Sequence, residues 1–297
     1  MPRLLFIALV ALAASGCIKS IATGALADAL SGPGNLGSDD DPELVRDAAP
    51  FGLKTMESVL EAHPEHVGLL TSLASGFTQY AYAFVQQDAD AAELEAKYAQ
   101  AKAGRLRAKK LYLRARDYGL RGLELSSPGI TERLKSMRGL SEAVAGLKKE
   151  DVPLVYWTAA AWALAVSNGK EDMQLVSELP APEALMTKAL ELDEAWGDGA
   201  LHEFFVSFEA AKPGGTEAGA KAHLDKAVAL AHGRRLGVQV SWAEGPLVQA
   251  QKREDFEAVL KAVLAADVDA SRADRLANII AQRRAKLLLD HADDLFN

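Results

Sequence analysis

A run of basic residues at 102–121 is the part of the sequence best suited to binding an anion. It holds eight cations against one acid, Asp117. Arg114 and Arg121 are seven residues apart and Tyr118 follows Arg114 by four, so a helix would place all three on one face. Because an arginine fork binds a carboxylate through parallel hydrogen bonds, Arg114, Tyr118 and Arg121 are candidate ligand-binding residues. The alternatives are a solvated flank whose alkyl stems cover the core, or a dock for an acidic partner.

Two tryptophans are further ligand-binding candidates. Trp157 and Trp162 lie in segment 152–168, which is apolar on two helical faces and is therefore expected in the middle of the fold. Aromatic side chains at such a place can line an apolar ligand channel between helix pairs. Packing in the core is the alternative role for both tryptophans.

Catalytic and metal-binding patterns are missing from the sequence. His202-Glu203 is followed by Phe-Phe-Val, so the HExxH zinc motif is absent, and there is neither a GxSxG elbow nor a glycine-rich phosphate loop. The tightest carboxylate cluster, 39–41, falls in a segment where no dry pocket would raise a pKa. We therefore expect a protein that is not an enzyme and that needs no metal or cofactor.

The first 17 residues indicate export and lipidation. A short cationic start, an eleven-residue apolar stretch and the small residues Ala14-Ser15-Gly16 are typical of a signal peptide over 1–16. The only cysteine, Cys17, follows directly, as in a bacterial lipobox. We predict lipid attachment at Cys17, which would anchor the chain to a membrane of the bacterial cell envelope, facing the periplasm. An ordinary signal peptide that leaves Cys17 a free thiol is the alternative.

Composition limits the remaining classes of function. The chain has 297 residues, a net charge of −8 and 49% hydrophobic residues. The acidic balance argues against a nucleic-acid partner, since such binding rests on basic contacts to phosphate. A single cysteine excludes an intrachain disulfide, and the longest apolar run is far below the roughly 20 residues of a membrane-spanning helix. The composition fits a compact acidic protein.

The pattern after a Gly/Pro/Asp-rich stretch is helical. We expect a lipidated N-terminus and linker over 17–42 and one helical domain over 43–297. Asp41-Pro42 is typical of a helix start, and Pro50 is predicted to kink or restart that helix. Further helices are predicted at 69–85, 90–125 (as one helix or two), 130–147, 152–168, 170–178, 183–193, 196–212, 216–231, 252–266 and 271–295. No segment shows the alternation of a strand, so the expected fold is all-α.

A weak internal repeat refines this architecture. Four helix ends resemble Ala189-Leu-Glu-Leu192, and they begin at residues 59, 122, 189 and 227. The tetratricopeptide period is about 34 residues, so the first two intervals are close to two periods each and the third is close to one. These matches predict degenerate tetratricopeptide-like stacked helical hairpins in one compact body. Chance similarity between amphipathic helices is the alternative explanation.

Several stretches together resemble the T-component lipoproteins of TRAP transporters, the TatT family. The stretches that carry the resemblance are 17–22 with 27–30, 38–51 (Ser-Asp-Asp-Asp-Pro-Glu-Leu-Val-Arg-Asp-Ala-Ala-Pro-Phe), 77–85 (Phe-Thr-Gln-Tyr-Ala-Tyr-Ala-Phe-Val), 111–121 and 275–285. They extend over nearly the whole chain.

The resemblance implies an accessory lipoprotein of a TRAP-type (tripartite ATP-independent periplasmic) transport system. It implies a helical, tetratricopeptide-like fold, a homotrimer, and pairing with a periplasmic solute-binding protein to bind or channel a small organic-acid or hydrophobic ligand. It supplies no catalytic residues. The alternative that the residues leave open is a scaffold lipoprotein that mediates protein–protein interactions in envelope assembly.

Overall fold

The chain folds into helices throughout the part described by a computed structural model, which covers residues 24, 26–30 and 35–296. Every regular element among these residues is helical, and this confirms the predicted all-α fold. No helix among them is long and apolar enough to cross a membrane. The predicted signal peptide, Cys17 and part of the linker lie outside the described residues, so lipidation stays a prediction.

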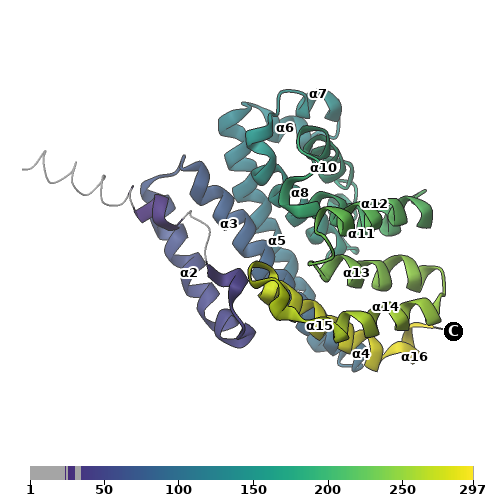
Figure 1. The fold of residues 1–297 in the computed structure, drawn as a ribbon. Helices are drawn as coiled ribbons and strands as arrows, with labels where there is room; N and C mark the ends of the chain where they lie inside the picture. The colour runs from purple at the N-terminus through teal and green to yellow at the C-terminus, as the bar shows by residue number, and fades with distance from the viewer. Residues whose placement is uncertain (1–23, 25, 31–34, 297) are drawn as a thin grey trace, which may run out of the picture.

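The N-terminal half is a row of long helices that pack side by side in chain order (Figure 1). These helices are α2 (Pro42–Ala62), α3 (Val67–Tyr80), α5 (Tyr98–Ser126), α8 (Val152–Ser167) and α10 (Pro180–Leu192). Shorter helices lie in the connections: α4 (Gln87–Leu94), α6 (Ile130–Lys135), α7 (Leu140–Val144) and α9 (Met173–Val176). Among the described residues α8 is the most apolar of the long helices, and it packs between α5 and α10 as its pattern predicts.

The C-terminal half has its own apolar core. Its helices are α11 (Ala200–Ala211), α12 (Glu217–Leu230), α13 (Gly237–Trp242), α14 (Arg253–Ala265), α15 (Arg275–Asp290) and α16 (Ala292–Leu295). Val206, Phe256 and Leu260 lie at the centre of this core. The chain then returns to its beginning, because α15 packs beside α2 through a small cluster of Val45, Phe84 and Ile280 (Figure 1).

Two helical segments have the wider π-type winding. The first, η2 (Ala81–Gln86), joins α3 to α4, and the second, η5 (Ala243–Leu247), continues α13. Pro246, which has no backbone N–H to donate, lies within η5. Single π-type turns inside helices occur frequently at functional sites. Both segments face the same interior region, which is described below.

Two helix predictions differ from the structure in detail, and a third, for 90–125, matches the second of its two alternatives. The prediction that Pro50 kinks or restarts a helix was wrong in that α2 continues through Pro50 to Ala62; burial of Leu53 and Leu60 against α3 compensates for the lost hydrogen bond. Segment 90–125 is two helices, because Ala96 takes a positive φ of 58° between them. Segment 130–147 also divides, at Gly139. The tetratricopeptide-like pairing of the helices stays a prediction.

Candidate functional site

The structure brings Arg114, Tyr118 and Arg121 together along one face of α5. A buried carboxylate from α2, Glu57, lies among them: its Oε1 is 2.5 Å from Arg114 Nη2 and accepts a 2.6 Å hydrogen bond from the Tyr118 hydroxyl. Arg121 donates to the carbonyl of Pro64 at 3.2 Å. We call Glu57, Arg114, Tyr118 and Arg121 the Arg114 cluster.

Glu57 is charged and neutralises Arg114. Burial raises the pKa of Glu57, but hydrogen bonds from Lys54 and Tyr118 and the charge of Arg114 outweigh it, so the pKa ends below its ordinary value. The Arg114 guanidinium also lies 5.1 Å from the centre of the Phe77 ring. A ligand carboxylate that bound Arg114 would therefore compete with a carboxylate of the protein itself.

The two candidate tryptophans occupy different surroundings from this cluster. Trp162 is fully buried, and its indole N–H donates to Glu178 at 2.8 Å while the Arg116 guanidinium lies over its ring. Trp157 is half-buried and makes an edge contact with the ring of Tyr156, 4.9 Å between centroids. The aromatic and hydrogen-bond partners of both are thus residues outside the Arg114 cluster.

A second polar cluster lies where the two halves of the molecule face each other, and its members come from seven segments. We call it the interior cluster: Tyr82 of η2, Asp90 of α4, Tyr156 of α8, Glu203 of α11, Arg235 before α13, Glu244 of η5 and Arg284 of α15. Both π-type segments contribute to it. This convergence of distant segments makes it the stronger candidate for a ligand site.

Ion pairs hold the interior cluster together. Arg284 donates two hydrogen bonds, of 2.8 and 2.9 Å, to the carboxylate of Glu244, and its third nitrogen lies 3.2 Å from Asp90. Asp90 is only 8% exposed and also pairs with Arg105 at 2.9 Å. Burial raises the pKa of Asp90, and the charges of the two arginines oppose that rise. Arg235 pairs with Glu203 at 3.3 Å.

Tyr82 and Tyr156 are the tyrosines of the interior cluster, and solvent reaches both side chains. Burial raises the pKa of each hydroxyl far above its ordinary value, and Glu244 and Glu203 respectively raise it further. Tyr82 is 38% exposed and Tyr156 is half-buried. Neither hydroxyl makes a hydrogen bond to another described residue.

Two aromatic rings pack against Tyr156 in the interior cluster. The ring of Tyr156 lies 4.8 Å from that of Trp196 and contacts Trp157 on another side. Apolar walls with a few free polar groups are typical of small-molecule sites. Among the described residues no group of three or more histidine, cysteine or acidic side chains is placed to hold a metal ion. The arrangement suits reversible binding through hydrogen bonds and apolar contact.

A buried histidine pair makes stability depend on pH. His202 Nδ1 and His223 Nδ1 are 2.8 Å apart, so one ring must donate and the other accept. Burial lowers the pKa of both below 6.5, and the hydrogen bond from His202 to Glu194 only partly opposes this. The free energy of unfolding therefore has its full value above about pH 6.5. It falls as the pH drops toward the folded-state pKa values, by at most about 1.4 kcal/mol per pH unit for each proton that the unfolded chain binds in excess of the folded one.

Urea unfolding between about pH 7.5 and about pH 5 tests this dependence. We expect His223→Gln to flatten the loss of stability over that range. The matched control is His291→Gln, which removes a more exposed histidine paired with Asp294, and it should keep the slope of the unchanged protein. An identical slope in both variants would contradict the assignment.

Comparison with known proteins identifies a family. A sequence model of the family "TRAP transporter T-component" matches residues 38–296, which is nearly the whole described region. The chain is also similar to an uncharacterized protein from Treponema pallidum (strain Nichols), with 27% identity over 273 residues that cover 87% of this chain and 81% of that protein. The match over the complete helical body, rather than over one motif, establishes that the chain belongs to the TRAP transporter T-component family.

Proposed function

We propose that this T-component binds a small organic acid or hydrophobic ligand at the interior cluster, against Tyr82 and Tyr156. Family membership places the chain among the accessory proteins of TRAP transport. The observation that supports ligand binding is that two enclosed, solvent-reached tyrosine hydroxyls make no hydrogen bond to another described residue. A tyrosine hydroxyl that has no protein partner and is reached by solvent can donate a hydrogen bond to a bound acceptor.

Two parts of the ligand would contact two kinds of surface. A carboxylate or carbonyl oxygen accepts hydrogen bonds from Tyr82 and Tyr156, and the apolar remainder lies against Trp157 and Trp196. Arg235 and Arg284 are each paired with a carboxylate of the protein, so the interior cluster presents little net positive charge to a ligand. Such a site releases its ligand readily, as a transport component requires. Ligand contact by Arg114, Tyr118, Arg121 and Trp162 stays a prediction from the sequence; we favour the interior cluster, because Arg114 already pairs with Glu57 and Trp162 is fully buried.

The wider role includes a membrane anchor and a protein partner. The lipobox at Cys17 supports attachment to an envelope membrane, with the helical body facing the periplasm. Family membership supports docking of the TRAP periplasmic solute-binding protein and a homotrimer. Co-purification of the detergent-extracted chain tests the docking: recovery of the solute-binding protein supports it. Recovery of a peptidoglycan or outer-membrane assembly factor in its place favours the scaffold alternative.

Mass spectrometry of small molecules that the purified chain carries tests the ligand site. We expect an organic acid or other apolar compound in the unchanged protein, and at least tenfold less in Tyr82→Phe/Tyr156→Phe, which keeps both rings and removes both hydroxyls, about 1.4 kcal/mol being tenfold. Arg114→Gln is the matched variant in the other cluster and should carry the normal amount. Loss of the compound in Arg114→Gln alone would move the site to the Arg114 cluster and overturn the proposal.

A further inference from the structure

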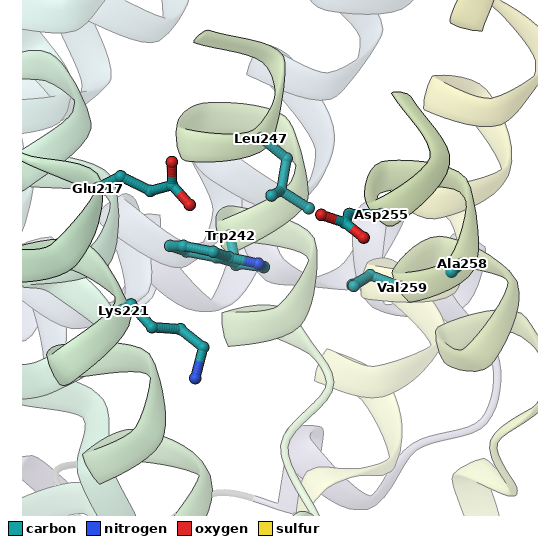
Figure 2. A pocket seen from close by; sticks show the side chains of 7 residues that line it. All are labelled: Glu217, Lys221, Trp242, Leu247, Asp255, Ala258 and Val259. Carbon is teal, nitrogen blue, oxygen red and sulfur yellow. The ribbon is translucent and has the colours of Figure 1, made fainter. Parts of the chain in front are cut away.

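A cleft of about 340 Å³ opens between α12 and α14, with α13 and η5 as its floor (Figure 2). Trp242 and Leu247 form the floor, and Glu217 and Asp255 stand on opposite walls. A second cleft of about 200 Å³ also has Glu217 in its wall and extends along η5 past Pro246. The two clefts share Glu217 as a lining residue, and we call the first of them the groove.

Trp242 offers an unused hydrogen-bond donor in this groove. Its side chain is only 7% exposed, its indole N–H has no partner among the described residues, and the nitrogen is not sealed off from solvent. In Figure 2 the nitrogen end of the indole is turned to the side of the cleft where Asp255 lies. A donor that has no partner in the protein and faces a cleft can donate a hydrogen bond to an acceptor from outside the chain.

The groove presents a negative charge to a group that enters it. Glu217 accepts a 2.5 Å hydrogen bond from Lys252, and Lys221 is paired with Asp225 at 2.6 Å. Asp255 forms no ion pair with any described residue. Its carboxylate stands near apolar Val259, which can support the alkyl stem of a long basic side chain.

We propose that the groove binds an extended segment of a partner protein that carries an arginine or lysine. A backbone carbonyl of the segment accepts the hydrogen bond of Trp242, the basic group pairs with Asp255, and its alkyl stem lies on Leu247 and Val259. The cleft, the unused donor of Trp242 and the free carboxylate of Asp255 together suit a peptide with a basic residue. This surface is distinct from the interior cluster and does not depend on what that cluster binds.

Nuclear magnetic resonance of the four indole N–H groups tests the proposal. The probe is the capped tripeptide acetyl-Ala-Arg-Ala-amide, with acetyl-Ala-Gln-Ala-amide as its uncharged counterpart. The Trp242 resonance is identified by its absence in Trp242→Phe. We expect the arginine peptide to shift this resonance saturably while the indole signals of Trp157, Trp162 and Trp196 stay in place, and these three signals also report that the fold is intact.

Substitutions at two neighbouring residues distinguish a direct contact with the peptide from a general effect of negative charge on binding. Asp255→Asn should weaken binding of the arginine peptide about fivefold, the equivalent of roughly 1 kcal/mol for one exposed ion pair. Glu254→Gln removes the same charge one residue away, outside the cleft lining, and should change binding less than twofold. Equal binding of the glutamine peptide, equal weakening by both substitutions, or a Trp242 resonance that does not move would each overturn the proposal.

Discussion

Replacing Arg284 with methionine is expected to lower the free energy of unfolding by about 3–5 kcal/mol. Arg284 is buried and satisfies the carboxylates of Glu244 and Asp90. Without it, Asp90 keeps a single cation, Arg105, and the main ion pairs between α15 and the interior cluster disappear. The measurement is the urea midpoint at neutral pH, with circular dichroism at 222 nm to follow the helices.

The adjacent arginine is a matched control for this substitution. Arg283 lies on the same helix, is far more exposed and pairs with Glu43 at 2.6 Å. Because exposed ion pairs contribute about 1 kcal/mol or less, Arg283→Met should leave the midpoint nearly unchanged. Adding Asp90→Asn to Arg284→Met should recover part of the loss, since it removes a buried charge that is left with one cation in place of two. Equal effects of the two arginine substitutions would contradict the role assigned to Arg284.

A methyl group added at Gly119 is expected to destabilise the fold by about 2–3 kcal/mol. Gly119 of α5 lies against α8, where a Cβ atom would stand 2.1 Å from the Thr158 hydroxyl oxygen and 3.2 Å from the Thr158 Cα. The hydroxyl cannot easily turn away, because it donates to the carbonyl of Leu154 at 2.6 Å. The two helices must therefore separate in Gly119→Ala, and thermal unfolding should show a lower midpoint.

At Gly52 the same glycine-to-alanine substitution is expected to stabilise the fold. It lies inside α2, and nothing would stand within 4 Å of an added Cβ. Alanine disfavours the unfolded chain relative to glycine, so Gly52→Ala should raise the free energy of unfolding by about 0.5–1 kcal/mol. A destabilisation at Gly52 as large as that at Gly119 would show that helix contact is not the cause.

The fold was largely predictable from local signals. Asp41 does begin α2, since its side chain accepts hydrogen bonds from the backbone N–H groups of Glu43 and Leu44, as the Asp-Pro pair predicts. Segment 232–251 was not predicted as helix, because Gly245 and Pro246 disfavour helical winding on their own. Packing of Val238 and Trp242 against the neighbouring helices outweighs that local preference.

The candidate sites depend on contacts that no local spacing reveals. The four-residue interval from Arg114 to Tyr118 did place them on one face, but nothing near them identifies Glu57, which comes from another helix. The interior cluster is even harder to predict from the sequence, because its members extend from Tyr82 to Arg284 and come together only after both halves have folded. An isolated tyrosine in an apolar helix gives no sign that its hydroxyl stays free.

The π-type segment η5 is a wall shared by two compartments. Glu244 turns to the interior cluster, and Leu247 turns to the outer groove, only three residues along the same widened turn. Tightening that turn to ordinary α-helical winding would rotate the residues after it by about 100° and shift both walls together. If binding on either side tightened the turn, occupancy on the outside and affinity on the inside would be linked, and such linkage is reciprocal by thermodynamic necessity.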